Sequence, residues 1–325
     1  MNQIQIKTPS RLHFGLLGWG GSNRRQFGGL GLMTQDPGLE LAVEVSNQIE
    51  ATGPHSSRAI SIAQSILERF KEFGLNPKPV HIQIKRAPDL HNGLGVGTQL
   101  SLAIARSLSL LFDADCVQPD NLAALTGRGQ RSGIGIHGFI EGGFIVDAGR
   151  RDGSVPARIV RTDFPENWSI LVVNPETPAG LHGPAELTAF RELPPIPETV
   201  TDSLCGIVML RLLPAIAEKD LEEFGRSLTE IQERVGECFA PAQGGKFASP
   251  ETERIVDFMK SLGLQGVGQS SWGPVLYGLS AFPLETRLKI RVEVGKRLQI
   301  TEDRIFWTCA CNRGSKIVIN KSEPN

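Results

Sequence analysis

The sequence carries almost no net charge. Its 34 lysines and arginines face 35 aspartates and glutamates, which leaves a formal charge of −1 over 325 residues. Nucleic acids and anionic membranes attract strongly basic surfaces, so neither is expected as the main partner. Hydrophobic residues make up 40% of the chain and charged residues 21%, as in a typical folded protein. The composition therefore excludes a disordered chain.

Cysteine is scarce, and its spacing shows no metal or disulfide pattern. There are five cysteines and no CxxC pair. Cys309 and Cys311 lie in an apolar run without a histidine or a further cysteine pair at ligand spacing, so a metal site there is the weaker interpretation. An odd count in a long chain favours reduced thiols, and we expect a cytoplasmic protein.

Long apolar runs are also missing. The segment Met1–Lys7 alternates polar and apolar residues and lacks the basic region and apolar core of a signal peptide. The run Leu100–Phe112 contains Arg106 and is shorter than the roughly 18 residues of a membrane span. We therefore expect no membrane segment.

Glycine, by contrast, is abundant and clustered. The 36 glycines concentrate at 15–31, 93–97, 127–149 and 263–278. Glycine permits positive φ and close approach of the backbone to a ligand. The four clusters predict loops that converge on one ligand, with ordinary tight turns as the alternative.

The order of predicted elements changes along the chain. Up to about residue 165 strands and helices mix, and after it helices dominate before an αβαβ ending. Strands are predicted at 4–8, 12–17, 39–45, 80–85, 139–147, 157–161, 169–173, 274–279, 304–309 and 315–320. Helices are predicted at 56–73, 97–112, 121–126, 184–190, 199–217, 220–235, 250–262 and 284–298. This pattern predicts an α+β protein with a ferredoxin-like C-terminal domain.

A glycine-rich loop leads into a long apolar helix. The loop contains Gly93, Gly95 and Gly97, is followed by Thr98 and Gln99, and comes after a predicted strand. The first amides of a helix and its positive dipole end attract anions, and glycines let a phosphate approach them. The spacing matches neither a Walker loop nor a Rossmann fingerprint. We interpret the loop as an anion site, with a plain strand–helix turn as the alternative.

Three segments resemble the motifs of the GHMP kinase superfamily, in the same order. Pro88–Leu102 is similar to the second motif, Pro-x3-Gly-Leu-Gly-Ser-Ser-Ala, with Val96 and Gly97 in place of the serines. Thr8–Gly15 resembles the first motif, and Gly266–Gly273 falls where the third lies. The resemblance covers nearly the whole chain. It implies a GHMP-type two-domain fold with the active cleft between the domains.

The resemblance also implies what each domain contains. Residues 1–165 would form an N-terminal mixed β-sheet with helices that carries the phosphate loop. Residues 166–325 would form the C-terminal ferredoxin-like domain. A homodimer is the family-based expectation.

One kinase residue is missing. Kinases of the superfamily carry Ser-Gly-x-Asp in the N-terminal domain, but Ser132–Gly133–Ile134–Gly135 has glycine where that Asp stands. Positioning and charge stabilisation dominate phosphoryl transfer, so the absence weakens the alternative of an ATP-dependent small-molecule kinase.

A narrower group fits these departures. The segments at 11–16, 27–33, 95–100, 127–135 and 175–186 resemble β-ribofuranosylaminobenzene 5'-phosphate synthase. That resemblance implies transfer of the phosphoribosyl group from phosphoribosyl pyrophosphate to 4-aminobenzoate, with release of carbon dioxide and pyrophosphate. It also implies dependence on Mg²⁺ and a place in tetrahydromethanopterin biosynthesis and one-carbon metabolism. Because the ring attacks through its carboxylated carbon, no ring proton has to be removed, which is consistent with the missing Asp.

Candidate site residues follow from this chemistry, each with a surface or packing role as its alternative. The catalytic candidates are Arg11, His13, Arg131, His182 and Glu186. The phosphate-binding candidates are Gly93, Gly95, Gly97, Thr98, Gln99, Arg24 and Arg25. The magnesium candidates are Thr98 and Asp147. Arg128 is a further local basic residue, and Phe27 would either stack on the acceptor ring or pack in the core.

Overall fold

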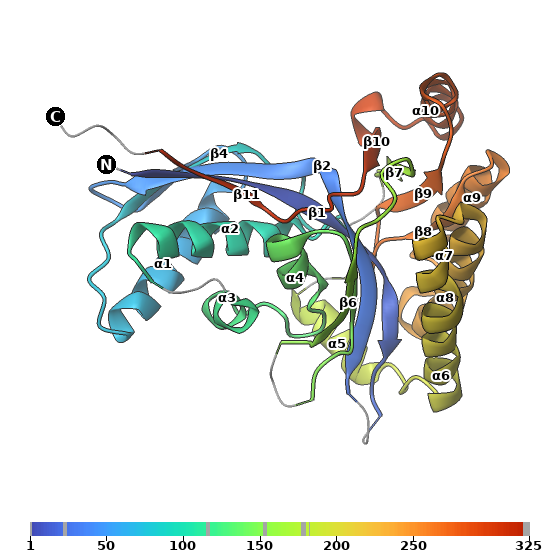
Figure 1. Ribbon diagram of the computed structural model, residues 1–325, viewed down its shortest axis with the longest axis horizontal. Helices are drawn as coiled ribbons and strands as arrows, with labels where there is room; N and C mark the ends of the chain where they lie inside the picture. Colours follow the sequence, from blue (N-terminus) through green and yellow to red (C-terminus); the bar gives the residue numbers. More distant parts are fainter. Residues whose placement is uncertain are drawn as a thin grey trace.

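The computed structural model describes residues 2–21, 25–114, 118–151, 155–176, 180–181 and 183–320. Two β-sheets lie in the molecule, with helices packed against both (Figure 1). The strands are β1 (Gln3–Gly18), β2 (Phe27–Val45), β3 (Glu50–Thr52), β4 (Val80–Arg86), β5 (Phe144–Asp147), β6 (Arg158–Thr162), β7 (Ser169–Val173), β8 (Gln265–Gln269), β9 (Leu276–Ser280), β10 (Ile305–Cys309) and β11 (Lys316–Asn320). The α-helices are α1 (Ser56–Glu72), α2 (Val96–Leu111), α3 (Pro119–Thr126), α4 (Ile134–Glu141), α5 (Gly183–Glu192), α6 (Glu198–Ile207), α7 (Leu213–Glu218), α8 (Leu221–Gln243), α9 (Pro250–Ser261) and α10 (Leu284–Leu298). A π-helical segment, η1 (Val208–Leu212), joins α6 to α7, and a 3₁₀ turn, η2 (Glu302–Arg304), precedes β10.

The first sheet is built around two long antiparallel strands. Its order is β11-β1-β2-β4-β3, and β5 and β6 extend it from the other half of β2. Most pairs are antiparallel, but β3 and β4 run parallel, so the sheet is mixed. Helices α1 to α4 lie along one face of this sheet (Figure 1). This is the predicted N-terminal arrangement.

The second sheet has the ferredoxin-like strand order. Its four antiparallel strands lie as β10-β7-β9-β8, which is fourth, first, third and second in chain order. Helices α8 and α9 pack on it beside β8, and α10 lies next to β10 (Figure 1). The predicted α+β fold, with a mixed first sheet and a ferredoxin-like second sheet, is therefore present.

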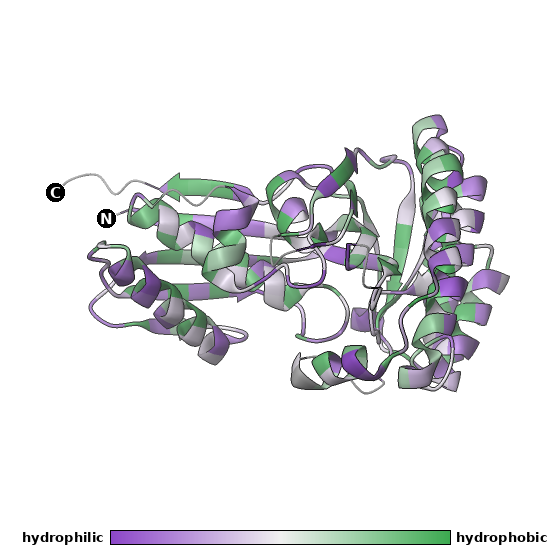
Figure 2. Ribbon diagram, turned by 90° about the horizontal axis from the view of Figure 1, so that it is seen from below, coloured by the Kyte–Doolittle hydropathy of each residue, from purple (hydrophilic) through white to green (hydrophobic). Residues whose placement is uncertain are grey.

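Strand β7 separates two hydrophobic cores. All five of its residues are buried, as the continuous apolar run Ser169–Val173 requires. Ile170 and Val172 face the larger core, whereas Leu171 and Val173 face the smaller one beneath α9 and α10. Hydrophilic and hydrophobic residues alternate along the outer helices (Figure 2), which is typical of helices with one buried side.

Two of the predicted strands are placed or divided differently in the structure. The last strand, expected with the C-terminal domain, pairs with β1 of the first sheet, from Gln3 opposite Asn320 to Lys7 opposite Lys316. The apolar run predicted as a strand at 139–147 splits into the end of α4 and β5, because Gly142 and Gly143 adopt φ of 65° and 81° between them. A short run that is buried in either conformation does not distinguish helix from strand.

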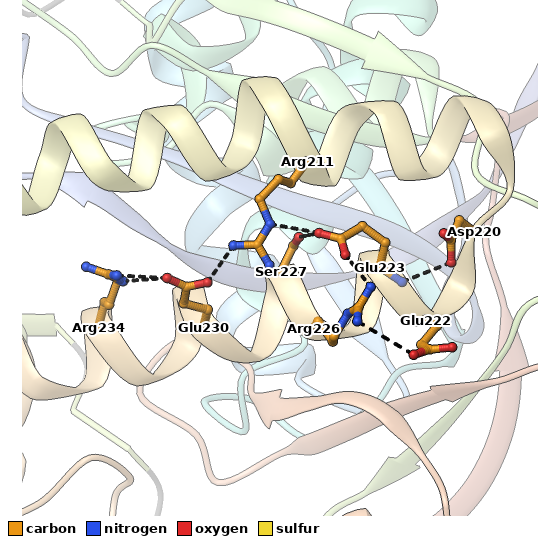
Figure 3. Close-up of polar contacts among 8 residues, drawn as sticks. All are labelled: Arg211, Asp220, Glu222, Glu223, Arg226, Ser227, Glu230 and Arg234. Atoms are coloured by element: carbon orange, nitrogen blue, oxygen red, sulfur yellow. Dashed lines mark hydrogen bonds and ion pairs between the residues drawn. The ribbon is translucent and has the colours of Figure 1, made fainter.

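The stretch 198–218, made of α6, η1 and α7, corrects the expectation of no membrane-length apolar run. It is long and apolar enough to cross a membrane by length and composition. Its Leu204 and Leu212 are fully buried in the protein core. Arg211 bridges to α8, where it contacts Glu223 at 2.7 Å and Glu230 at 2.6 Å (Figure 3). Packing and ion pairs thus attach this stretch to the fold.

Candidate functional site

A cleft of about 550 Å³ lies where β1, the loop before α2, helix α5 and helix α8 meet. Its described lining includes Arg11 and Thr98 from the N-terminal half and Phe239 and Trp272 from the C-terminal half. Glycines from all four sequence clusters contribute to it, namely Gly15, Gly93, Gly95, Gly97, Gly127, Gly129 and Gly273. The predicted convergence of glycine-rich loops therefore occurs at one cleft.

The floor of the cleft is an irregularity in β1. The register with β2 shifts between His13 and Gly15, and such bulges redirect side chains. The Gly15 N–H donates to His13 Nδ1 at 3.3 Å, so the ring proton of neutral His13 is on Nε2. Burial, and then the charge of Arg11, hold the pKa of His13 well below its usual range. His13 is consequently an uncharged polar group at neutral pH.

The glycine-rich loop begins α2 as predicted, but it offers different amides. Gly95 caps the helix with φ of 71°, and its carbonyl accepts from the Thr98 and Gln99 N–H groups at 3.0 and 3.1 Å. Among the described hydrogen bonds, none uses the amides of residues 93–97 as donors. The amides that remain open to an anion are therefore those of 93–97, rather than those of Thr98 and Gln99.

Ser270 holds the three motif segments together. Its Oγ accepts from the His13 N–H at 3.0 Å and donates to the Gly93 carbonyl at 2.7 Å. The side chain is completely buried. A Cβ on Gly93 would lie 2.6 Å from the Ser270 carbonyl, so the approach requires glycine there. The contact fixes the anion loop against β1 and the third motif.

Four arginines line the cleft, and three of them, Arg11, Arg58 and Arg128, lie at this loop. Arg11, Arg58, Arg128 and Arg131 all line the cleft. A Cβ on Gly97 would lie 3.4 Å from Arg58 Nη2 and 3.8 Å from Arg128 Nη2, so both guanidinium groups flank the helix start. Arg58 comes from α1 and was not predicted, because nothing in the sequence links that helix to the loop.

The arginines are crowded and partly unpartnered. Burial, followed by the charges of Arg58 and Arg131, lowers the pKa of Arg128. Burial lowers the pKa of Arg11 to about 10, so it stays positive at neutral pH. Arg11 Nε has no hydrogen-bond partner among the described residues. Uncompensated positive charge of this kind favours an anionic ligand.

One carboxylate faces the arginines in the described lining. Glu186 on α5 binds Arg131 Nη2 at 2.5 Å and accepts from the Trp272 indole N–H at 3.1 Å. The Arg131 guanidinium also lies 5.7 Å from the centre of the Phe190 ring. Glu186 thus links the arginine end of the cleft to an aromatic end.

Three candidates with predicted site roles lie away from the cleft lining. Gln99 is buried and donates to the Gly135 carbonyl at 2.9 Å, and Arg25 donates to the Gly149 carbonyl at 2.9 Å. Asp147 is fully buried and accepts from the Gly133 and Gly149 N–H groups, both at 2.9 Å. Burial raises the pKa of Asp147 in spite of these bonds. All three side chains bond backbone groups, Gln99 in the first turn of α4 and Arg25 and Asp147 at the glycines that flank α4 and β5.

Two further candidate residues, Arg24 and His182, lie outside the described residues.

The position that corresponds to the missing kinase aspartate, Gly135, is described. A Cβ on Gly135 would lie 3.1 Å from Thr98 Cγ2, so that position adjoins the anion loop. The remaining candidates, Arg11, His13, Gly93, Gly95, Gly97, Thr98, Arg131 and Glu186, lie together along the cleft.

Comparisons with known proteins match this arrangement. A family model described as GHMP kinases C terminal matches residues 212–296. The chain is 35% identical over 299 residues to a beta-ribofuranosylphenol 5'-phosphate synthase of Methanothermobacter thermautotrophicus, covering 86% of this chain and 89% of the relative. A protein of the same name from Archaeoglobus fulgidus is 30% identical, over 85% of this chain and 88% of its own length.

Solved structures support the fold. A homoserine kinase from Cytophaga hutchinsonii has a TM-score of 0.68 at 17% identity and covers 97% of both chains. A mevalonate kinase from L. major, in complex with R-mevalonate, has a TM-score of 0.65 at 16% identity, over 95% of this chain and 96% of its own. Likenesses at this level of identity concern the fold alone.

Proposed function

The chain belongs to the family of the beta-ribofuranosylphenol 5'-phosphate synthases, and we propose that its cleft transfers a phosphoribosyl group from phosphoribosyl pyrophosphate to the carboxylated carbon of 4-aminobenzoate. Carbon dioxide and pyrophosphate are released. The observation that supports this most strongly is that four arginines line the same cleft as the unused amides of residues 93–97. Such a group suits a diphosphate that gains negative charge as it leaves.

The arginines and the loop act on the donor. Gly97 lets the diphosphate approach the helix start between Arg58 and Arg128, and Thr98 adds a hydroxyl there. Arg11 and Arg131 extend the positive charge toward the aromatic end of the cleft. Bidentate contacts from guanidinium groups would hold the diphosphate in one orientation. Cleavage of the anomeric C–O bond leaves the electron pair on pyrophosphate and positive charge on the sugar.

The acceptor completes the reaction without a protein base. The ring carbon that carries the carboxylate forms a bond to the anomeric carbon. The C–C bond to the carboxylate then breaks, and its electron pair restores aromaticity as carbon dioxide leaves. No proton is gained or lost at the ring. This agrees with a neutral His13 and with Gly135 in place of an acidic residue.

The described residues do not fit a magnesium site held by the protein. Among them, no group of three or more His, Cys, Asp or Glu residues could hold a metal ion. Glu186, the carboxylate in the described cleft lining, is engaged by Arg131 and Trp272. Asp147 directs its oxygens to backbone N–H groups. The mechanism therefore assigns no step to Mg²⁺ and places the neutralisation of the diphosphate on the arginines.

A second acceptor has a specific observation in its favour. Both relatives are named as synthases of a ribofuranosylphenol 5'-phosphate. A phenol product carries a hydroxyl where an aminobenzene carries an amino group, so 4-hydroxybenzoate is the corresponding acceptor. Both substituents donate electrons to the attacking carbon, and the same bond changes apply.

Further features of the protein belong to the same proposal. We take residues 1–165 and 166–325 as the two domains, with β11 returning to the first sheet. We also propose a cytoplasmic homodimer that acts on small molecules in tetrahydromethanopterin biosynthesis, with neither nucleic acid nor membrane as partner. The near-zero net charge supports the last point.

The test measures products with the purified protein. Phosphoribosyl pyrophosphate is mixed with 4-aminobenzoate or 4-hydroxybenzoate in the presence of Mg²⁺, and pyrophosphate and carbon dioxide are quantified. Equal amounts of both are expected with at least one acceptor. A folded protein that releases neither, or that phosphorylates homoserine or mevalonate with ATP, would contradict the proposal and favour the kinase alternative.

A further inference from the structure

Aromatic side chains gather along one part of the cleft lining. Aromatic residues make up only 6% of the chain. Five of them nevertheless form one contact group, which consists of Trp19, Phe27, Phe190, Phe239 and Trp272. Three of these, Phe190, Phe239 and Trp272, line the cleft, and we call them the aromatic wall.

The rings of the aromatic wall are fixed by one another. The ring centres of Trp272 and Phe239 lie 4.6 Å apart, with an angle of 70° between the ring planes. The ring centre of Phe190 lies 5.6 Å from that of Trp272, with an angle of 73° between the planes. Trp19 stacks on Phe239 at 4.7 Å from outside the cleft lining. Edge-to-face and stacked pairs at these separations are favourable, so the wall is preorganised.

The aromatic wall is open to the cleft. Trp272 is buried, but Phe190 and Phe239 are only partly buried and line the cavity together with Leu187 and Val235. Gly15 in β1 lets helix α8 pack closely against the strand here, since a Cβ there would lie 3.3 Å from Val235 Cγ2. A planar apolar ring would therefore find both ring faces and ring edges to contact.

The wall also adjoins the arginines. Glu186 joins the Trp272 indole to Arg131, and Arg131 lies over Phe190. An aromatic acid in the cleft would accordingly lie with its ring on the wall and its carboxylate toward Arg131 and Arg11. The carbon that carries the carboxylate would then face the bound donor.

Building on the proposed function, we propose that the aromatic wall is the binding site for the ring of a para-substituted benzoate, and that Phe239 is a specificity-determining residue for this acceptor. The position explains why Phe27 is not needed as a stacking partner. Phe27 contacts Phe190 at 5.4 Å and is absent from the described cleft lining. Its ring supports the wall from behind.

The experiment compares Phe239→Leu with Phe27→Leu, the same change in the same aromatic group outside the cleft lining. Calorimetry measures the binding of 4-aminobenzoate and of inorganic pyrophosphate separately, and kinetics give KM for each substrate. We expect Phe239→Leu to weaken the affinity for the aromatic acid by about tenfold and to change the affinity for pyrophosphate by no more than about twofold. Phe27→Leu is expected to change neither by more than about twofold. Phe239→Tyr, which restores a ring, should recover binding of the acid.

Several outcomes would overturn the assignment. One is that Phe239→Leu leaves the affinity for the aromatic acid unchanged. Another is that it weakens the binding of pyrophosphate by the same factor as the binding of the acid. Equal effects of Phe27→Leu would show a structural role only. If Phe239→Leu does not fold by thermal melting, Phe190→Leu carries the same comparison.

The test separates the two proposals. If the wild-type protein turns over its substrates and the Phe239→Leu variant still binds the acid normally, the synthase activity stands. The aromatic wall is then not the binding site for the acid. If binding of the acid depends on Phe239 but no turnover occurs, the aromatic wall stands as the binding site. The proposed synthase activity is then wrong.

Discussion

Thr98 shows how a single residue serves both the fold and the proposed reaction. Its methyl group faces the space beside Gly135, and the side chain is only partly buried in the cleft wall. Its amide is used by the helix cap, so the hydroxyl is the group that it offers to a ligand.

Replacing Thr98 by valine should keep the shape and remove that hydroxyl. A hydrogen bond to a charged group contributes about 1.5–3 kcal/mol, so we expect kcat to fall about tenfold or more. The effect on binding should be smaller, because the bond strengthens as the diphosphate leaves. Steady-state kinetics with the donor varied would measure this.

Thr162→Val provides the matched control, because Thr162 lies in β6 and is absent from the described cleft lining. Its kinetics should equal those of the wild type. Unchanged kinetics for Thr98→Val would remove Thr98 from the site.

At this scale the sequence identifies residue types but not their partners. Arg11, His13, Arg131 and Glu186 were predicted for the cleft and line it. Asp147 carries an equally suitable carboxylate, yet backbone N–H groups occupy its oxygens. Which polar group satisfies which backbone amide depends on contacts distant in sequence, and the sequence alone does not contain them.

The element that matters most for the donor is the start of α2. Gly95 has a left-handed φ of 71°, and a Cβ there would lie 3.2 Å from Arg11 Cβ and 3.3 Å from Arg11 Nε. The glycine thus fits both the helix cap and the path of the Arg11 side chain across the loop.

Gly95→Ala should therefore affect stability and donor binding together. An alanine in the left-handed region costs about 1–2 kcal/mol of unfolding free energy. Displacement of Arg11 should also raise KM for phosphoribosyl pyrophosphate by about fivefold or more. Denaturant unfolding and steady-state kinetics would measure the two effects.

Gly74→Ala isolates the first effect. Gly74 follows α1 with φ of 82° and has open space at its Cβ position. This variant should lose similar stability and keep its KM. Equal KM changes in both variants would contradict the proposed contact between Gly95 and Arg11.

Element prediction succeeded where periodicity was long and failed where glycine interrupts it. Helices α1 and α2 and strand β7 lie close to their predicted ranges. Strand β8, Gln265–Gln269, was missed because two of its five residues are glycines. Its place in the sheet comes from pairing with β9 and packing under α8, which are tertiary effects.

The whole molecule brings together segments from both ends of the chain. The anion loop, β1 and the third motif meet at Ser270, and α5 and α8 add Phe190 and Phe239 to the aromatic wall. The order of the three motifs allowed this meeting to be predicted as a cleft between two domains. The contribution of Arg58 from α1, and the return of β11 to the first sheet, depend on the folded arrangement.

For the whole molecule we propose that the cleft joins the sugar to the ring carbon from which carbon dioxide leaves. Mass spectrometry of the product formed from ring-tetradeuterated 4-aminobenzoate or 4-hydroxybenzoate tests it most directly. We expect a phosphoribosylated product that retains every ring deuterium and lacks the carboxylate. A product that has lost one ring deuterium, or that retains its carboxylate, would contradict it.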